Sequence, residues 1–159
     1  MKRMMLACLL LIIGSASAVT TSGWYQLSDL RVYDLPPSKA NGSAWDPLGG
    51  APDVMVSLQT DMGDGVYDDF TTRVVSDVTT SASWATEEVI AVYTGIDSPS
   101  LYFTVTDHDI SNHDPMDCGS IYASELSTTE TNLVRCEYGT KIEFSLEFIE
   151  ETVLFMDAQ

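Results

Sequence analysis

Almost every patterned segment of this chain predicts a β-strand, and this constrains its fold more than any other feature. In residues 141–149 every second residue is large and apolar, so these side chains would share one face of a strand. Turn-forming Gly, Pro and Asn residues separate this segment from others that also predict strands. The others are residues 24–33, 54–58, 70–78, 87–93, 101–106 and 152–156.

Seven or eight short strands separated by turns predict an all-β protein, folded as an antiparallel β-sandwich. Residues 120–126 form the one segment that could hold a short helix. The sequence contains no internal repeat and no low-complexity linker, so we expect a single domain.

The first 18 residues have the composition of a secretory leader. Lys2 and Arg3 give a basic start, residues 4–13 are apolar, and Ala16-Ser17-Ala18 is a small-residue cleavage site. The apolar run is too short to span a bilayer. We therefore expect a mature domain of residues 19–159, secreted into an extracellular or periplasmic space. A retained membrane anchor is the alternative.

The chain is strongly acidic, with a formal net charge of −17. Loss of Lys2 and Arg3 with the leader would change this to −19. Such a protein is not expected to bind nucleic acid, because it cannot neutralise phosphates. It is also not expected to bind an anionic membrane unless something reverses its charge locally.

Two cysteines, Cys118 and Cys136, remain after the leader is removed. In an oxidising compartment they predict one disulfide. A zinc or redox role is not favoured, because the sequence has no Cys-x-x-Cys motif.

Residues 101–119, LYFTVTDHDISNHDPMDCG, carry the strongest functional signal. Their first half alternates like a strand and leads into Asp107 and Asp109, whose side chains should point to the same side. Asp114 and Asp117 follow closely. Carboxylates so close together repel one another unless a cation lies between them, and calcium prefers six to eight oxygen ligands. The stretch therefore predicts metal binding rather than catalysis.

Other interpretations of the acidic segments have less support. His108 and His113 raise the possibility of a transition metal, but His108 alternates with its neighbours and should point away from them. Residues 61–69 are rich in Asp and Gly, but they lack the Glu that ends an EF-hand loop, so a hairpin turn explains them more simply. The chain has no nucleophile-elbow motif, and we do not expect an enzyme.

A second acidic stretch, residues 41–53, contains Asp46 and Asp53 and leads into the apolar strand 54–58. Both acidic stretches are loops beside apolar strands, so a sandwich could bring them to the same end.

Five motifs occur in an order that resembles a C2 domain, the calcium-dependent β-sandwich module. They cover roughly residues 24–126. The motifs are an alternating strand (25–32), an acidic loop with Asp53-Val54-Met55-Val56, a Thr72-Arg73-Val74 segment, the segment 81–88 around Trp84, and the strand and acidic loop of 101–119.

The resemblance implies an eight-stranded sandwich with calcium ligands in two loops. By position they are Asp46 and Asp53 in the first loop, and Asp107 and Asp109 in the second. The family's fifth carboxylate precedes a loop-closing Gly. Relative to Gly119, Asp114 stands early and Asp117 late, so both remain candidates.

The expected function is calcium-dependent binding to a phospholipid surface or to an extracellular partner. The alternative is a metal-independent structural or adhesion sandwich that is acidic for solubility.

Overall fold

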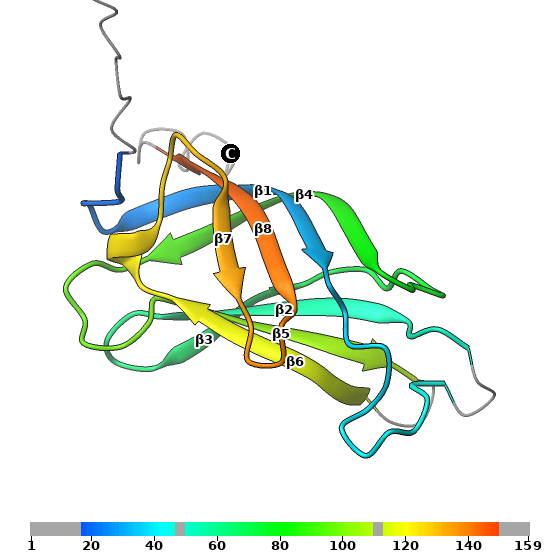
Figure 1. Ribbon diagram of the computed structural model, residues 1–159. Helices are drawn as coiled ribbons and strands as arrows, with labels where there is room; N and C mark the ends of the chain where they lie inside the picture. Colours follow the sequence, from blue (N-terminus) through cyan, green and yellow to red (C-terminus); the bar gives the residue numbers. More distant parts are fainter. Residues whose placement is uncertain (1–16, 47–49, 110–112, 150–159) are drawn as a thin grey trace, which may run out of the picture.

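The computed structural model describes residues 17–46, 50–109 and 113–149, which form a two-layered sandwich of antiparallel strands (Figure 1). The predicted all-β sandwich is therefore confirmed. One 3₁₀ turn, η1 (Ala123–Glu125), lies within the predicted helical segment. The strands are β1 (Gly23–Tyr33), β2 (Val54–Asp61), β3 (Val66–Thr71), β4 (Ser81–Val92), β5 (Leu101–His108), β6 (His113–Ile121), β7 (Asn132–Arg135) and β8 (Lys141–Phe148).

Each layer contains four strands. One sheet has the order β4-β1-β8-β7 and the other has the order β3-β2-β5-β6. The edge strands β6 and β7 lie on the same side of the sandwich, so the two sheets meet there as well as through their faces (Figure 1). No helix within the described residues is long and apolar enough to cross a membrane.

The core lies between the sheets and is built from the inward rows that the alternation predicts. Ile142, Phe144 and Leu146 of β8 are buried, and the ring of Phe144 lies 5.1 Å from that of Phe103 on the opposite sheet. Phe148 is 43% exposed, because the inward row ends before it. Burial of such side chains is the main stabilising contribution in a sandwich of this size.

Several predicted strand boundaries were wrong. Instead of the strand expected over residues 70–78, β3 begins at Val66 and ends at Thr71, where the side-chain oxygen of Thr72 accepts the N–H of Val56 and interrupts the ladder. Strand β4 begins at Ser81, six residues before the expected segment.

Strands β6 and β7 lie in segments where the alternation predicted no strand. β6 contains Pro115, and the structure accommodates it because β6 is an edge strand that pairs with β5 alone. β7 has four residues, too few for a visible alternation. The leader up to residue 16 and the final strand predicted at residues 152–156 lie outside the described residues.

The predicted disulfide is not formed in this structure, where Cys118 and Cys136 are both free thiols. Cys118 is exposed, whereas Cys136 is buried in the core beside Gly119. The two side chains therefore lie in different environments, although the carbonyl of Cys118 accepts the N–H of Glu137. Burial, together with the charge of Asp117, raises the pKa of Cys136 to about 12.

Candidate metal centre

The two acidic loops lie at the same end of the sandwich. Figure 1 shows the β1–β2 loop, in cyan, beside the ends of β5 and β6. The loops are joined directly, because the backbone N–H of Asp53 donates to Oδ1 of Asp107 at 2.9 Å. The convergence expected from the sequence is therefore present in the fold.

Asp107 ends the inward row of β5 and is the most buried carboxylate of this end. Leu101, Phe103 and Val105 precede it in the same row, and Asp107 is 1% exposed. While Oδ1 accepts the bond from Asp53, Oδ2 has no hydrogen-bond partner among the described residues. A buried polar atom without a partner is costly. Oδ2 is thus an oxygen that a hydrogen-bond donor or a bound cation would stabilise.

The environment of Asp107 favours its protonated form. Burial raises the pKa of Asp107 above its ordinary value, because the charged carboxylate loses its hydration. The hydrogen bond from Asp53 lowers this pKa, the charge of Asp109 raises it, and the ammonium of Lys39 lowers it.

Asp53 connects the centre to a third loop. Its carbonyl accepts the N–H of His108 at 2.7 Å, which ties the start of β2 to the end of β5. Its Oδ1 accepts the N–H of Asp77 at 3.0 Å, from the segment between β3 and β4. Asp77 adopts a φ of 56°, in the left-handed region that Asp tolerates better than most residues. Asp53 is therefore positioned through contacts with both neighbouring segments.

Strand register decides the position of Asp114, which is the direct cross-strand partner of Asp107 in the β5–β6 hairpin. Cross-strand partners have Cβ atoms about 5 Å apart, and like charges placed so are destabilising. Lys39, from the β1–β2 loop, forms an ion pair with Asp114. The hydrogen bond with Asp114 raises the pKa of Lys39, and the charges of Asp107 and Asp109 act in the same direction.

Asp109 and Asp46 complete the candidates of the two loops. Asp109 is half-buried, and its charge acts on both Asp107 and Lys39, so it belongs to the same cluster. Asp46 is also half-buried, and its carboxylate lies against the backbone of Gly50. Asp46 and Gly50 thus approach each other on either side of residues 47–49.

Asp117 has a different set of contacts. Its Oδ2 accepts the N–H of Thr140 at 3.0 Å, and both of its oxygens accept the N–H of Tyr138, at 3.1 and 3.2 Å. A bulge between the Val105 and Thr106 pairings in the β5–β6 ladder separates Asp117 from the register of Asp114. Asp117 therefore fixes the β7–β8 turn, while Asp114 faces Asp107.

The two histidines pair with each other. His108 and His113 are cross-strand partners, with ring centroids 4.4 Å apart. His108 follows the inward-facing Asp107 and so lies on the other face of the strand, as its position in the alternation indicates.

The donors at this end suit a hard cation in type and charge. Within residues 17–46, 50–109 and 113–149, no three Asp, Glu, His or Cys side chains are already arranged as metal ligands. Carboxylates are nevertheless the oxygen donors that calcium prefers. The buried Oδ2 of Asp107 has no partner among the described atoms, and Lys39 is the cation that faces the cluster. The residues therefore fit calcium, with Lys39 positioned to compete for the carboxylates.

Lys39 and Asp77 also belong to this end, although the sequence pattern predicted neither of them. For Lys39 a signal exists, because it is the one basic residue between Arg31 and Arg73. Asp77 acts through its backbone N–H, so its side-chain type could not reveal the contact.

The fold can be compared with solved structures. No protein-family model matches the chain, and no curated protein matches its sequence. A structure of a C2 domain matches with a TM-score of 0.53 and 17% identity, over 78% of this chain and 97% of that domain. The chain has the fold of a C2 domain. The family resemblance seen in the sequence is thus confirmed at the level of the fold.

Two other similar structures are longer chains, and this chain matches a part of each. Extended synaptotagmin 2, in a calcium-bound structure of its two C2 domains, matches with a TM-score of 0.58 and 16% identity, over 84% of this chain and 46% of that one. Human GIVD cytosolic phospholipase A2, in complex with an inhibitor and terbium chloride, matches with a TM-score of 0.59 and 17% identity. That match covers 85% of this chain and 18% of the phospholipase.

Proposed function

We propose that this chain is a C2-like module that binds calcium at the acidic end and, in that form, binds a phospholipid surface or an extracellular partner. The main support is the buried Oδ2 of Asp107, which has no hydrogen-bond partner among the described residues and lies close to other carboxylates. Extended synaptotagmin 2, which shares the fold, is calcium bound in its structure.

The ligands in this proposal come from three parts of the fold. Asp107 lies in β5 and Asp109 follows that strand, whereas Asp53 directly precedes β2. Asp46 and Asp114 would add oxygens from the flanking segments. Asp117 is left out, because its carboxylate already accepts backbone N–H groups of the β7–β8 turn.

Bound calcium would supply the positive charge that offsets the mutual repulsion of these carboxylates. In the metal-free protein Lys39 supplies part of that charge through its ion pair with Asp114. Lys39 would have to leave Asp114 for this carboxylate to serve as a ligand. The freed ammonium and the neutralised cluster would then let an anionic phospholipid headgroup approach.

The proposed setting is extracellular or periplasmic, after cleavage of the leader at Ala18. A dissociation constant of about 0.1–1 mM is sufficient for a calcium-binding module outside cells. The proposal is for binding rather than catalysis.

The melting temperature of residues 19–159, measured in EGTA and across a calcium titration, tests this function. With a dissociation constant of about 0.1 mM, about 10 mM calcium stabilises the folded protein by about 2.7 kcal/mol. For a domain of this size the corresponding rise is about 8 °C. Magnesium at equal ionic strength controls for charge screening. Co-sedimentation with phospholipid vesicles in calcium and in EGTA then tests the partner.

The double variant Asp107→Asn with Asp109→Asn locates the site. Loss of the calcium response with retention of the fold supports the proposed ligands. An unchanged response in the variant would place the calcium elsewhere.

A metal-independent structural or adhesion module is the second candidate, favoured by the ion pair between Lys39 and Asp114. In that case Lys39 is the permanent counter-ion of the acidic end, and the titration gives a flat curve.

A further inference from the structure

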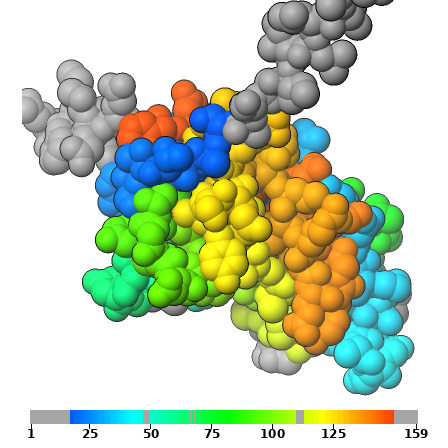
Figure 2. Space-filling model, turned by 60° about the vertical axis from the view of Figure 1, so that its left-hand side comes forward, coloured from blue at the N-terminus to red at the C-terminus, as the bar shows by residue number. Residues whose placement is uncertain are grey.

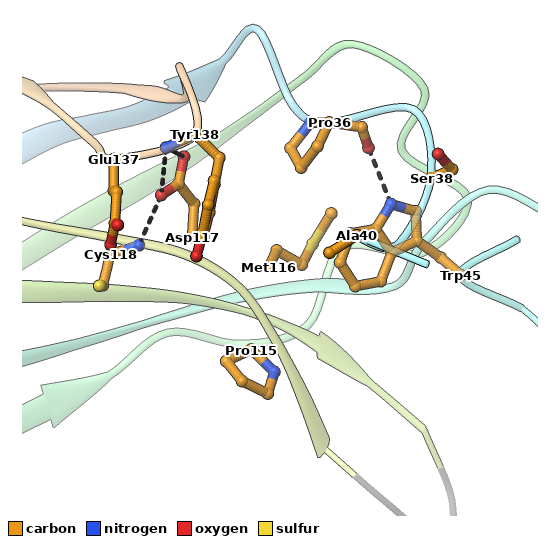
Figure 3. A pocket seen from close by; sticks show the side chains of 10 residues that line it. All are labelled: Pro36, Ser38, Ala40, Trp45, Pro115, Met116, Asp117, Cys118, Glu137 and Tyr138. Atoms are coloured by element: carbon orange, nitrogen blue, oxygen red, sulfur yellow. Dashed lines mark hydrogen bonds between the residues drawn. The ribbon is translucent and has the colours of Figure 1, made fainter. Parts of the chain in front are cut away.

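A pocket of about 440 Å³ lies beside the acidic end, between the β1–β2 loop, the start of β6 and the β7–β8 turn (Figure 3). Its buried apolar lining residues are Trp45 and Met116, which are 5% and 3% exposed. Pro36, Pro115 and Tyr138 form its sides. Its volume lies within the range of small-molecule and side-chain binding pockets.

The walls are held in place by contacts that leave an apolar surface. The indole N–H of Trp45 donates to the carbonyl of Pro36 at 2.8 Å, so the polar atom of this ring is already bonded. Asp117 holds the opposite wall, because it accepts the backbone N–H groups of Tyr138 and Thr140. Figure 3 shows the bond between Trp45 and Pro36 on one side of Met116 and the bonds between Tyr138 and Asp117 on the other. The pocket is therefore formed before any ligand arrives, which lowers the entropic cost of binding.

One wall of the pocket reaches solvent through an aromatic ring. Tyr138 is 68% exposed, the largest exposure among the large apolar and aromatic residues of the described part. It stands next to Gly139, whose φ of 103° forms the tight β7–β8 turn. An exposed ring on a rigid turn, above a buried Trp and Met, matches the anchor pockets of protein interfaces.

The charge around the pocket selects the ligand. Among the described residues that line it are Asp117 and Glu137, and none of these described residues is Lys or Arg. Lys39, between the lining residues Ser38 and Ala40, is paired with Asp114. The chain as a whole carries a formal net charge of −17. A partner that reaches this pocket should therefore be basic.

We propose that the pocket binds a large apolar side chain carried on a basic segment of a partner protein. The apolar side chain covers Trp45 and Met116, and the flanking cations lie near Glu137 and the acidic end. This site is separate from the proposed calcium ligands and does not require calcium.

Fluorescence anisotropy with a short labelled peptide, in which lysines flank one phenylalanine, tests the proposal in EGTA. Replacing the phenylalanine by alanine should weaken binding by about tenfold or more, since burial of a Phe side chain is worth about 1.5–3 kcal/mol. Replacing the lysines by glutamates should abolish binding. Equal binding of the alanine peptide would show attraction by charge alone and overturn the proposal.

Two variants of the protein locate the binding. Ala40→Trp fills the pocket from an exposed position, and Tyr138→Ala removes its exposed wall. Both variants should weaken the binding of the phenylalanine peptide by about tenfold. Tyr67→Ala is the matched control, because Tyr67 is 47% exposed on β3 and does not line the pocket.

Unchanged peptide binding in both pocket variants would overturn the proposal. The same variants are tested against neutral phosphatidylcholine vesicles. If they lose vesicle binding but keep peptide binding, the pocket is a lipid site and the proposal is wrong. The peptide assay contains EGTA, so its result does not depend on calcium binding. A negative peptide assay therefore does not count against the proposed calcium site, and a flat calcium titration does not count against the pocket.

Discussion

Asp107 differs from every other residue of the inward row of β5, because it carries a carboxylate where its neighbours carry apolar groups. In the metal-free protein its ionised form is buried with one oxygen that has no hydrogen-bond partner among the described residues. Asp107 therefore works against stability at neutral pH unless a cation is bound.

We predict that Asp107→Asn stabilises the metal-free protein at neutral pH. The folded-state pKa of Asp107 is raised by burial, so the folded protein holds this proton more tightly than the unfolded chain does. The stability due to this group is complete below its ordinary pKa and is lost as the pH rises through the raised folded value. The melting temperatures of the parent protein and of Asp107→Asn, measured in EGTA, should therefore diverge as the pH rises from 4. At pH 7 the variant should have the higher melting temperature.

The asparagine keeps an Oδ1 that can accept the N–H of Asp53, so the loop contact should survive. A variant less stable than the parent at every pH would contradict this view of Asp107 and point to loss of structure instead.

Lys39 is the residue expected to compete with calcium. We predict that Lys39→Gln raises calcium affinity by about tenfold, measured by calorimetry. The reason is that Lys39 pairs with Asp114 and faces the charges of Asp107 and Asp109.

Lys141→Gln is the matched control, because Lys141 also pairs with an aspartate, Asp34, at 2.5 Å. It removes the same charge from a different carboxylate. If both variants change the affinity equally, long-range charge is responsible and Lys39 has no specific role.

The sequence predicted part of this centre at the residue scale. Alternation correctly indicated that Asp107 shares the inward side of its strand, because that argument needs local geometry alone. It left Asp114 and Asp117 as equal candidates, because their positions depend on a bulge in the pairing with β5. A bulge changes register without a clear local signature, so this choice required the fold.

At the scale of elements, the edge strands β6 and β7 close the sandwich. Gly119 of β6 lies so near β7 and the residue after it that a Cβ would come within 2.7 Å of Val134 Cγ1. It would also lie 2.9 Å from Cys136 Sγ and 3.2 Å from Cys136 Cα, which is backbone and cannot move aside alone. The glycine therefore allows the two sheet edges to approach.

We predict that Gly119→Ala destabilises the protein by about 1–3 kcal/mol, as overpacking does in other cores. Urea unfolding measures the change. Gly23→Ala is the control: its nearest neighbour is the Phe148 ring at 2.9 Å, on a half-exposed side chain that can turn away. If the two substitutions destabilise the protein equally, the loss of backbone freedom, rather than the β6–β7 contact, explains the effect of Gly119→Ala.

The same edges show where prediction of elements from the sequence ends. Strands with long inward rows, such as β1, β5 and β8, were predicted nearly to their ends, since burial imposes the alternation. The short strand β7 and the proline-containing strand β6 owe their conformation to partners distant in sequence. Tertiary context of this kind has no counterpart in a local pattern.

At the scale of the whole molecule, acidic charge should limit stability. The formal net charge is −17, and Lys and Arg number 7 against 24 Asp and Glu. We predict that the melting temperature in EGTA rises as sodium chloride increases from about 10 mM to about 100 mM, where the Debye length falls from about 30 Å to about 10 Å.

Sodium and potassium chloride should act equally, because screening does not depend on the ion's identity. Calcium should add a further, saturable rise at constant ionic strength. A melting temperature independent of salt would show that the acidic residues are too dispersed to repel one another measurably.

The N-terminal side of the fold is fastened at the end opposite the acidic loops. The N–H of Val19 donates to the carbonyl of Leu126 at 2.9 Å, and Ala18 forms a bridge with Ser127. Figure 2 shows these first described residues, in blue, far from the β1–β2 loop, in cyan. A mature chain coupled to a solid support through its N terminus at Val19 would therefore present its acidic loops and its pocket away from that surface. In such an orientation the domain would act as a spacer between two surfaces, and a sensor chip coupled through the N terminus would leave both proposed sites open to the flowing solution.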